Sequence, residues 1–390
     1  ARLYDTFGTP RDLIRVAMEE RELSVDEETF QLTIDEETFN DRFEIALREL
    51  QSMGAKEHAA ARGQIGQTYS QIAQRIPPSE FTGYESTRLE DSRVLALIKS
   101  DQERTELNEG DEGEVVLDQT PFYAESGGQV GDVGRLVINA RGSEQVTRSN
   151  QPATAGGTDL IASVVDTYSP AQGLIVHKVK VEKGTLKVGE TVSAEVDVEK
   201  RDATRRNHTA THLMHAALRE VLGTHVKQAG SVVAPDYLRF DFSHYQPLTK
   251  SEIEEIENLV NYHILRNEPV ETNEMAVEEA MRSGAMALFG EKYGEKVRVL
   301  SIKGAEDIFS KELCGGTHVR ATGDIGLFKI TSDESIASGI RRIRAVTGVD
   351  AFQRFREAEV ILEKVASGLR TSRTELPFQV ERLQEELKKV

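Results

Sequence analysis

Two histidines one helical turn apart give the strongest chemical signal in the sequence. His208 and His212 lie in a predicted helix over 203–222, and at positions i and i+4 their imidazoles project from the same side. His215 falls on that side too. The opposite side is apolar and predicts a packed core, with Ala210, Leu213, Met214, Ala217, Leu218, Val221 and Leu222. Paired imidazoles at this spacing are typical ligands of one metal ion.

A second pair of ligands stands about a hundred residues later, in Cys314-Gly-Gly-Thr-His318. The two glycines let the backbone bend, so that the thiolate and the imidazole can meet one centre. Three imidazoles and one thiolate suit Zn²⁺ best, and we expect one zinc ion per chain. Four protein ligands would close a structural site, whereas a catalytic zinc keeps a position for water or substrate, and the spacing leaves both open. A metalloprotease is disfavoured because Thr209 stands where its general-base Glu would be.

Two further features are weaker. The glycine-rich segment 122–132 fits neither the dinucleotide nor the P-loop pattern, and its composition favours a β-turn. Two arginine clusters stand out from an acidic chain of net charge −18. They could contact phosphates near the metal, or they could be ordinary solvated side chains; their members are Arg201, Arg205 and Arg206, and Arg341, Arg342 and Arg344.

The elements that position these residues define an α+β multidomain chain. Residues 1–78 are read as a helical segment, with capping boxes at Ser24/Glu27 and Thr33/Glu36, and Pro77-Pro78 ends it. Short β-like runs between turns predict an all-β barrel over 79–199. A mixture of helices and a hairpin predicts an α+β zinc-binding core over 200–349. The remainder, 350–390, is predicted to be helical, with a break near Gly368 and Pro377 and a coiled-coil-like spacing after it.

The composition of the 390 residues excludes several classes of protein to which the chain could otherwise belong. A single cysteine excludes an internal disulfide, and no apolar run approaches the roughly 20 residues needed to cross a bilayer. We therefore expect a cytoplasmic protein with no membrane partner. The acidic balance argues against a general nucleic-acid coat protein, although it allows a local basic site. Because the sequence does not begin with methionine, we expect it to be a segment of a longer protein.

Taken together, these motifs resemble the editing region of alanyl-tRNA synthetase. The likeness rests on Arg205–His215, Cys314–His318 and 122–132, and extends to Leu238–His244, 284–293, Thr322–Leu327 and Arg341–Gly348. It implies an editing core at 200–349 that hydrolyses the ester of serine or glycine wrongly attached to tRNA(Ala) while sparing alanine. The part that uses ATP and Mg²⁺ to activate alanine would lie upstream. A homodimer through a further C-terminal region is also implied.

The resemblance assigns roles to particular residues. The zinc ligands are His208, His212, Cys314 and His318, and Thr211 and Gln228 recognise the amino acid. The glycine-rich loop, with Gly127, Gly128 and Gln129, approaches the aminoacyl end of the tRNA, and the acceptor stem is contacted by Arg205, Arg206, Arg341 and Arg342. Candidates for the general base are His215, a ribose hydroxyl of the tRNA and a water held by Gln228.

Two other functions stay open. A freestanding deacylase of the same lineage would edit in trans, but the leader Leu3–Gly8 resembles the synthetase rather than such an enzyme. A non-catalytic, zinc-organised module for tRNA binding or dimerisation would hold the metal and leave the ester intact.

Overall fold

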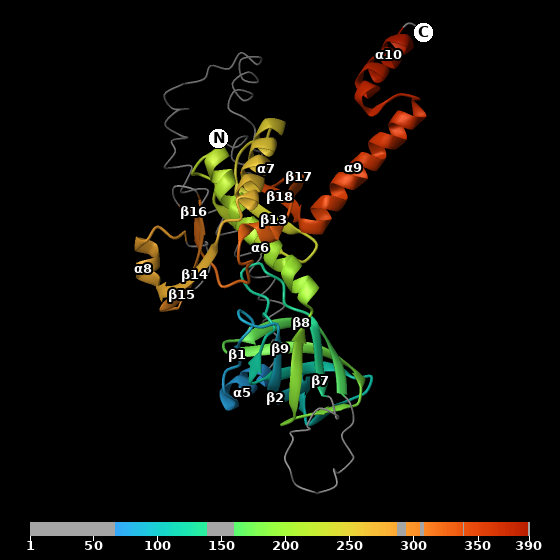
Figure 1. Ribbon diagram of the computed structural model, residues 1–390. Helices are drawn as coiled ribbons and strands as arrows, with labels where there is room; N and C mark the ends of the chain where they lie inside the picture. Colours follow the sequence, from blue (N-terminus) through green and yellow to red (C-terminus); the bar gives the residue numbers. More distant parts are fainter. Residues whose placement is uncertain (1–66, 139–159, 287–293, 305–307, 338, 389–390) are drawn as a thin grey trace, which may run out of the picture.

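The computed structural model describes residues 67–138, 160–286, 294–304, 308–337 and 339–388. The predicted helices of 1–66 and the motif residues 287–293 lie outside the described residues. Among the described ones, a β-barrel and an α+β domain are joined by one long helix, α6, which rises from the barrel into the second domain (Figure 1).

The predicted barrel is confirmed. Six antiparallel strands form the wall, which closes because the last strand pairs back with the first; in spatial order they are β2 (Arg88–Lys99), β5 (Glu112–Leu117), β9 (Leu174–Lys183), β8 (Leu160–Ala171), β7 (Gly134–Ile138) and β11 (Thr191–Val196). Alternate Val and Leu side chains fill the interior. The barrel domain also contains five short strands: β1 (Glu80–Phe81), β3 (Gln102–Arg104), β4 (Glu106–Asn108), β6 (Gln119–Thr120) and β10 (Thr185–Lys187). Outside the barrel, α5 (Gln67–Arg75) packs through Tyr69 and Ile72.

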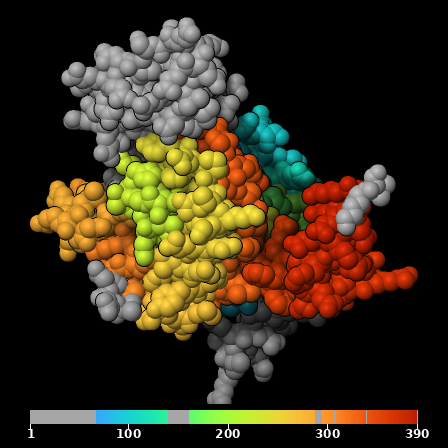
Figure 2. Space-filling model, turned by 90° about the horizontal axis from the view of Figure 1, so that it is seen from above, coloured from blue at the N-terminus to red at the C-terminus, as the bar shows by residue number. Residues whose placement is uncertain are grey.

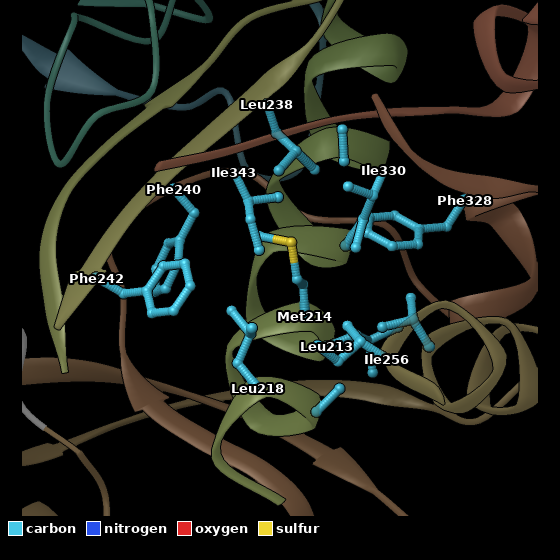
Figure 3. Close-up of a cluster of buried hydrophobic side chains, with 14 of the residues drawn as sticks. Leu213, Met214, Leu218, Leu238, Phe240, Phe242, Ile256, Phe328, Ile330 and Ile343 are labelled. Atoms are coloured by element: carbon cyan, nitrogen blue, oxygen red, sulfur yellow. The ribbon is translucent and has the colours of Figure 1, made fainter. Parts of the chain in front are cut away.

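Helix α6 (Val198–Leu222) begins five residues earlier than its apolar pattern indicated. The reason is a cap: the Asp197 carboxylate accepts a hydrogen bond from the Lys200 N–H at 3.1 Å. The boundary expected at 199/200 therefore falls inside the first turn of α6. The predicted apolar side of α6 packs into the core of the second domain, where Leu213, Met214 and Leu218 converge with Phe240 and Ile343 (Figure 3).

The second domain contains two antiparallel sheets. The larger has four strands, β12 (Gln228–Val233), β13 (Leu238–Ser243), β18 (Ile340–Thr347) and β17 (Phe328–Ala337), and α6 and α7 (Lys250–Leu265) pack against it. Helix α7 begins at the predicted capping box of Thr249 and Glu252. The smaller sheet combines β14 (Val270–Ala276), β15 (Lys296–Lys303) and β16 (Ile308–Leu313), followed by the 3₁₀ turn η1 (Thr322–Ile325).

The remaining helices lie at the periphery. Figure 2 shows α8 (Val277–Arg282) and the C-terminal helices on opposite sides of α7. The C-terminal part consists of α9 (Gly348–Gly368), η2 (Arg373–Glu375) and α10 (Leu376–Lys388). The predicted break is confirmed: α9 ends at Gly368, and α10 begins at Leu376 with Pro377 in its first turn, where the missing N–H of the proline leaves no intrahelical bond unmade. No helix of the described residues is long and apolar enough to cross a membrane.

The glycine-rich segment connects the two domains. Gly127 and Gly128 adopt positive φ angles of 57° and 82° in a turn closed by the Gln129 N–H, which donates to the Ser126 carbonyl at 3.0 Å. This confirms the β-turn that its composition favoured. The Val233 N–H of β12 donates to the Gly128 carbonyl at 2.7 Å, and the Val130 N–H donates back to the Val233 carbonyl at 3.0 Å. The turn therefore extends the edge of the larger sheet.

Candidate metal centre

The side of α6 opposite the core carries the histidine pair. His208 and His212 are buried, and their rings stack with centroids 5.3 Å apart at an interplanar angle of 15°. This follows from the helix geometry, since residues four apart lie one above the other. Two adjacent imidazoles are thus presented toward the segment that follows β16.

That segment brings the second pair of ligands. The Sγ atom of Cys314 lies 3.4 Å from Nε2 of His208 and 3.2 Å from Nε2 of His318. One ligand atom from each of the four predicted residues lies within 4.8 Å of the others. Gly316 permits this approach, because a Cβ at its position would stand 2.0 Å from Cε1 of His208. The four groups therefore converge, as the spacing predicted.

The donor set fits a zinc ion. Tetrahedral zinc with sulfur and nitrogen ligands separates the ligand atoms by roughly 3.3–3.8 Å, so movements of about 1 Å would complete the site. The Nε2 atom of His212 is buried and has no hydrogen-bond partner among the described residues. A buried polar atom without a partner is costly, and a metal ion would satisfy it.

The electrostatics favour a thiolate. Burial opposes ionisation, but electrostatic interactions with the imidazoles of His208, His318 and His212 hold the pKa of the Cys314 thiol well below its usual range. Burial and the charge of His208 also lower the pKa of His318 to about 3, which keeps this imidazole neutral. Metal ligation requires a deprotonated cysteine and neutral imidazoles, and both conditions are met for this pair.

The barrel contributes directly to the site through Gln129. This side chain is fully buried, and its Oε1 accepts hydrogen bonds from Nδ1 of His208 at 2.8 Å and from the Thr317 N–H at 2.9 Å. Its Nε2 donates to the Thr317 hydroxyl at 2.9 Å. Gln129 therefore fixes the tautomer of His208 with Nε2 free toward Cys314. The resemblance assigned Gln129 to tRNA contact, and in the structure it is enclosed between His208 and Thr317.

Glu312 is a second supporting residue, and the sequence analysis missed it. Its buried carboxylate lies 3.0 Å from Nδ1 of His212 and 3.1 Å from Nδ1 of His215. Burial raises the pKa of Glu312, but the charges of His212 and His215 outweigh it and lower this pKa below its ordinary value. Conversely, burial lowers the pKa of His212, and the negative charges of Glu312 and Cys314 raise it to about 10.

The three other predicted pocket residues lie on α6, which carries the histidine pair, and at the start of β12. Thr211 is buried on α6, and its hydroxyl donates to the Asn207 carbonyl at 2.8 Å, which leaves its oxygen lone pairs able to accept. Gln228 begins β12, and its Nε2 lies 3.3 Å from the Ser231 hydroxyl. His215 contacts Phe240 at a centroid distance of 5.1 Å, and its Nε2 has no partner among the described residues.

The arginine clusters separate into two kinds. Arg201 is fully buried and pairs with Asp132. Arg341 is buried against Asp333, while Arg342 makes two hydrogen bonds to Asp241 at 2.7 and 2.8 Å. Arg205 and Arg206 are partly buried beside the metal centre and line a cleft there. Only this pair of the predicted phosphate contacts therefore borders the site.

Comparison with known proteins finds two family models that match parts of this chain. A family model described as "tRNA synthetases class II (A)" matches residues 1–200, and one described as "Threonyl and Alanyl tRNA synthetase second additional domain" matches residues 297–344. The second match contains Cys314 and His318 and the strands that position them. The class of protein is thus that of the class II tRNA synthetases, with an additional domain of the editing type.

Relatives define the family more closely. The chain is 46% identical over 390 residues to alanine–tRNA ligase of Thermus thermophilus, and 45% identical over 383 residues to that of Myxococcus xanthus. A similar enzyme of Sphingopyxis alaskensis shares 45% over 391 residues. These alignments cover 98–100% of this chain and 39–41% of the relatives. The chain belongs to the alanyl-tRNA synthetase family and spans about two fifths of the length of these relatives.

Proposed function

We propose that this chain hydrolyses the ester that links serine or glycine to tRNA(Ala) and spares the ester of alanine. The observation that supports this most directly is the convergence of His208, His212, Cys314 and His318 beside the buried hydroxyl of Thr211. A metal-ligand set next to hydrogen-bonding side chains suits hydrolysis of a polar substrate with selection by its functional group.

One zinc ion per chain would be held by His208, His212, Cys314 and His318. When bound, it would supply Lewis acidity, which lowers the pKa of a water molecule and stabilises negative charge on an ester oxygen. Gln129 and Glu312 hold the imidazoles of His208 and His212 in the orientation required for this.

Selection between amino acids follows from elementary energetics. A synthetic site fitted to alanine gains only about 1–3 kcal/mol against glycine, which lacks one methyl group, so errors arise that a second site must remove. In that second site, the Thr211 oxygen can accept a hydrogen bond from the serine hydroxyl. Alanine has no such group and leaves the buried oxygen without its partner, which disfavours the alanyl ester relative to the seryl ester; this contact does not distinguish glycine from alanine.

A direct experiment measures amino-acid release from seryl-, glycyl- and alanyl-tRNA(Ala) by this chain, with zinc content determined on the same sample. Rapid loss of serine and glycine with alanine retained, at about one zinc per chain, is the expected result. An intact seryl ester despite bound zinc and bound tRNA would contradict the proposal and favour the non-catalytic module. Nothing observed favours a freestanding deacylase.

The whole protein is proposed to be an alanine–tRNA ligase. Its ATP- and Mg²⁺-dependent attachment of alanine to tRNA(Ala) would use parts of the relatives' length that this chain does not span. The tRNA is then the partner of both activities. A homodimer remains a proposal, for which the exposed apolar side chains of α9 and α10, such as Phe352 and Leu387, leave surface available.

A further inference from the structure

The loop that carries Cys314 and His318 is held by hydrogen bonds on two sides. Two consecutive peptide units, Gly315–Gly316 and Gly316–Thr317, have their carbonyls bound by side chains outside the metal centre and their N–H groups directed toward it. Because the carbonyl and the N–H of a planar trans peptide point in opposite directions, a bond to one fixes the direction of the other. The loop therefore transmits the positions of outer side chains to the ligand atoms.

The first peptide unit connects the barrel with the thiolate. The Tyr84 hydroxyl, on the barrel loop between β1 and β2, donates to the Gly315 carbonyl at 2.5 Å. At the opposite end of the same peptide, the Gly316 N–H donates to Sγ of Cys314 at 3.4 Å. Hydrogen bonds in a chain polarise one another, so the bond from Tyr84 strengthens the bond to sulfur. A side chain of the barrel thus acts on a ligand that belongs to the other domain.

The second peptide unit connects β15 with His208. Nη1 of Arg298 donates to the Gly316 carbonyl at 2.9 Å, and the Thr317 N–H donates to Oε1 of Gln129 at 2.9 Å. The same Oε1 accepts the hydrogen bond from Nδ1 of His208. Arg298 therefore supports the group that fixes the tautomer of His208.

The two outer side chains also hold each other in place. The guanidinium of Arg298 lies 3.5 Å from the ring centroid of Tyr84, and Nη2 of Arg298 donates to the Thr272 hydroxyl of β14 at 3.1 Å. The ring of Tyr84 also meets Phe81 of β1 edge to face, with the centroids 4.8 Å apart. Tyr84 is thus anchored in the barrel and Arg298 in the smaller sheet. These contacts immobilise the side chains that bind the loop carbonyls.

The hydrogen bond to sulfur has a chemical consequence. A thiolate that accepts an N–H bond has part of its charge compensated, so it donates less charge to a bound metal ion. This preserves the Lewis acidity that the proposed hydrolysis needs. The packing of the Tyr84 ring does not require its hydroxyl, so the hydroxyl can be removed without emptying the space that the ring fills.

We propose that Tyr84 and Arg298 are positioning residues of the metal centre. They orient two peptide units of the metal loop so that the N–H groups support the Cys314 thiolate directly and His208 through Gln129. This inference rests on the proposed function, because it takes zinc as the ion of the centre. It adds that the docking of the barrel tunes the donor strength of the thiolate.

Cobalt substitution tests this arrangement, because the thiolate-to-cobalt charge-transfer absorption reports the electron density on sulfur. Zinc affinity and the cobalt spectrum are measured for the 390-residue chain, for Tyr84→Phe and for Arg298→Met. We expect zinc affinity to be about tenfold weaker in each variant. In Tyr84→Phe the charge-transfer band should also move to longer wavelength, since a weaker N–H bond leaves more charge on sulfur. Arg298→Lys, which can still donate to the Gly316 carbonyl, should recover most of the affinity.

Tyr262→Phe is the matched control for the hydroxyl. Tyr262 is exposed to a similar degree and has the guanidinium of Arg266 5.5 Å from its ring centroid, but it lies on α7. This variant should match the wild type in both measurements.

Two results for Tyr84→Phe would overturn the inference. The first is wild-type affinity with an unshifted band. The second is weaker affinity with an unshifted band, because this would indicate only a loosened fold. If the band does shift in Tyr84→Phe while the zinc-loaded wild type leaves seryl-tRNA(Ala) intact, the proposed function fails and the role of Tyr84 stands, so the two failures are distinguishable.

Discussion

The carboxamide oxygen of Gln129 accepts a hydrogen bond from Nδ1 of His208 at 2.8 Å, although 79 residues separate the two in the chain. One belongs to a turn of the barrel and the other to α6. The metal centre is therefore assembled from both domains. Its imidazole geometry depends on the docking of the glycine-rich turn against β12, and this dependence can be measured.

Replacing Gln129 by alanine should weaken zinc binding about 10–100-fold, because the tautomer and orientation of His208 lose their support. The measurement is a competition titration with a chromophoric zinc chelator. Gln102→Ala, an exposed glutamine on β3 of the same barrel, is the control and should bind zinc as the wild type does. Equal zinc affinity of the Gln129 variant and the wild type would show that His208 needs no such partner.

The two glycines of the metal loop should respond differently to alanine. A Cβ at Gly316 meets His208 Cε1 at 2.0 Å, whereas a Cβ at Gly315 meets nothing within 4 Å. Gly316→Ala should displace His208 and lower zinc affinity about tenfold or more, and Gly315→Ala should retain about one zinc per chain. Metal analysis of the two purified variants decides the matter. Similar zinc content in both would be inconsistent with the packing described.

Removing the hydroxyl of Thr211 should affect serine selectively. Thr211→Val keeps the volume but loses an acceptor, so hydrolysis of seryl-tRNA should slow by about 5–30-fold, equivalent to 1–2 kcal/mol, with the low alanyl rate unchanged. Thr204→Val is a matched control, since its hydroxyl makes the same bond to a carbonyl four residues earlier on α6. An equal effect of the two variants on seryl-tRNA would remove Thr211 from recognition.

The ion pair of Arg201 and Asp132 should be a major contribution to stability. Arg201 is fully buried and also donates to the carbonyls of Gly83 at 2.8 Å and Pro121 at 2.7 Å. Arg201→Gln leaves a buried carboxylate unpaired and should lower the free energy of unfolding by about 3–5 kcal/mol. Arg135→Gln, which removes an exposed partner of Glu195, should cost about 0–1 kcal/mol. Urea unfolding of the two variants measures both losses of unfolding free energy. A loss below about 1 kcal/mol for Arg201→Gln would contradict a major contribution of this ion pair to stability.

Acid should destabilise the barrel through His177. Its buried ring is neutral, since Nδ1 donates to the Val115 carbonyl at 2.9 Å and Nε2 accepts from the Thr120 hydroxyl at 2.8 Å. Burial lowers the pKa of His177 to about 4, against an opposing effect of the Val115 bond. The unfolded chain, with an ordinary pKa near 6.5, binds the proton first. The contribution of neutral His177 to the free energy of unfolding is therefore fully present above about pH 6.5. It falls by about 3 kcal/mol as the pH decreases to 4.

Urea unfolding of the wild type and of His177→Gln at pH 7 and pH 4 isolates this contribution from the titration of carboxylates. The wild type should lose more stability than the variant over this interval. If both chains lose the same amount, His177 is not the group responsible.

The sequence predicted the site best where one element determines it. Helical periodicity placed His208 and His212 on one side of α6, and the spacing of Cys314 and His318 predicted the second pair. Strand alternation offered an unused signal for Glu312, which lies two residues before Cys314 and therefore faces the same way. Gln129 had no such signal, because its position follows from the pairing of a barrel turn with β12.

The role of the clustered arginines was harder to predict from sequence, because it depends on whether each side chain is buried against a carboxylate or exposed to solvent. Arg201, Arg341 and Arg342 occur in basic clusters, yet each is used in an ion pair with a carboxylate distant in sequence or on a neighbouring strand. The start of α6 was similarly misplaced, because a capping aspartate rather than an apolar pattern sets it.

The central claim is that the four-ligand centre performs editing. Its most direct test is the initial rate of serine release from seryl-tRNA(Ala) by the chain as isolated, after complete zinc removal, and after zinc is restored, with circular dichroism on each sample. We predict rapid release, loss of at least about a hundredfold without zinc, and recovery on its return. Undiminished release from a folded, zinc-free chain would contradict the account.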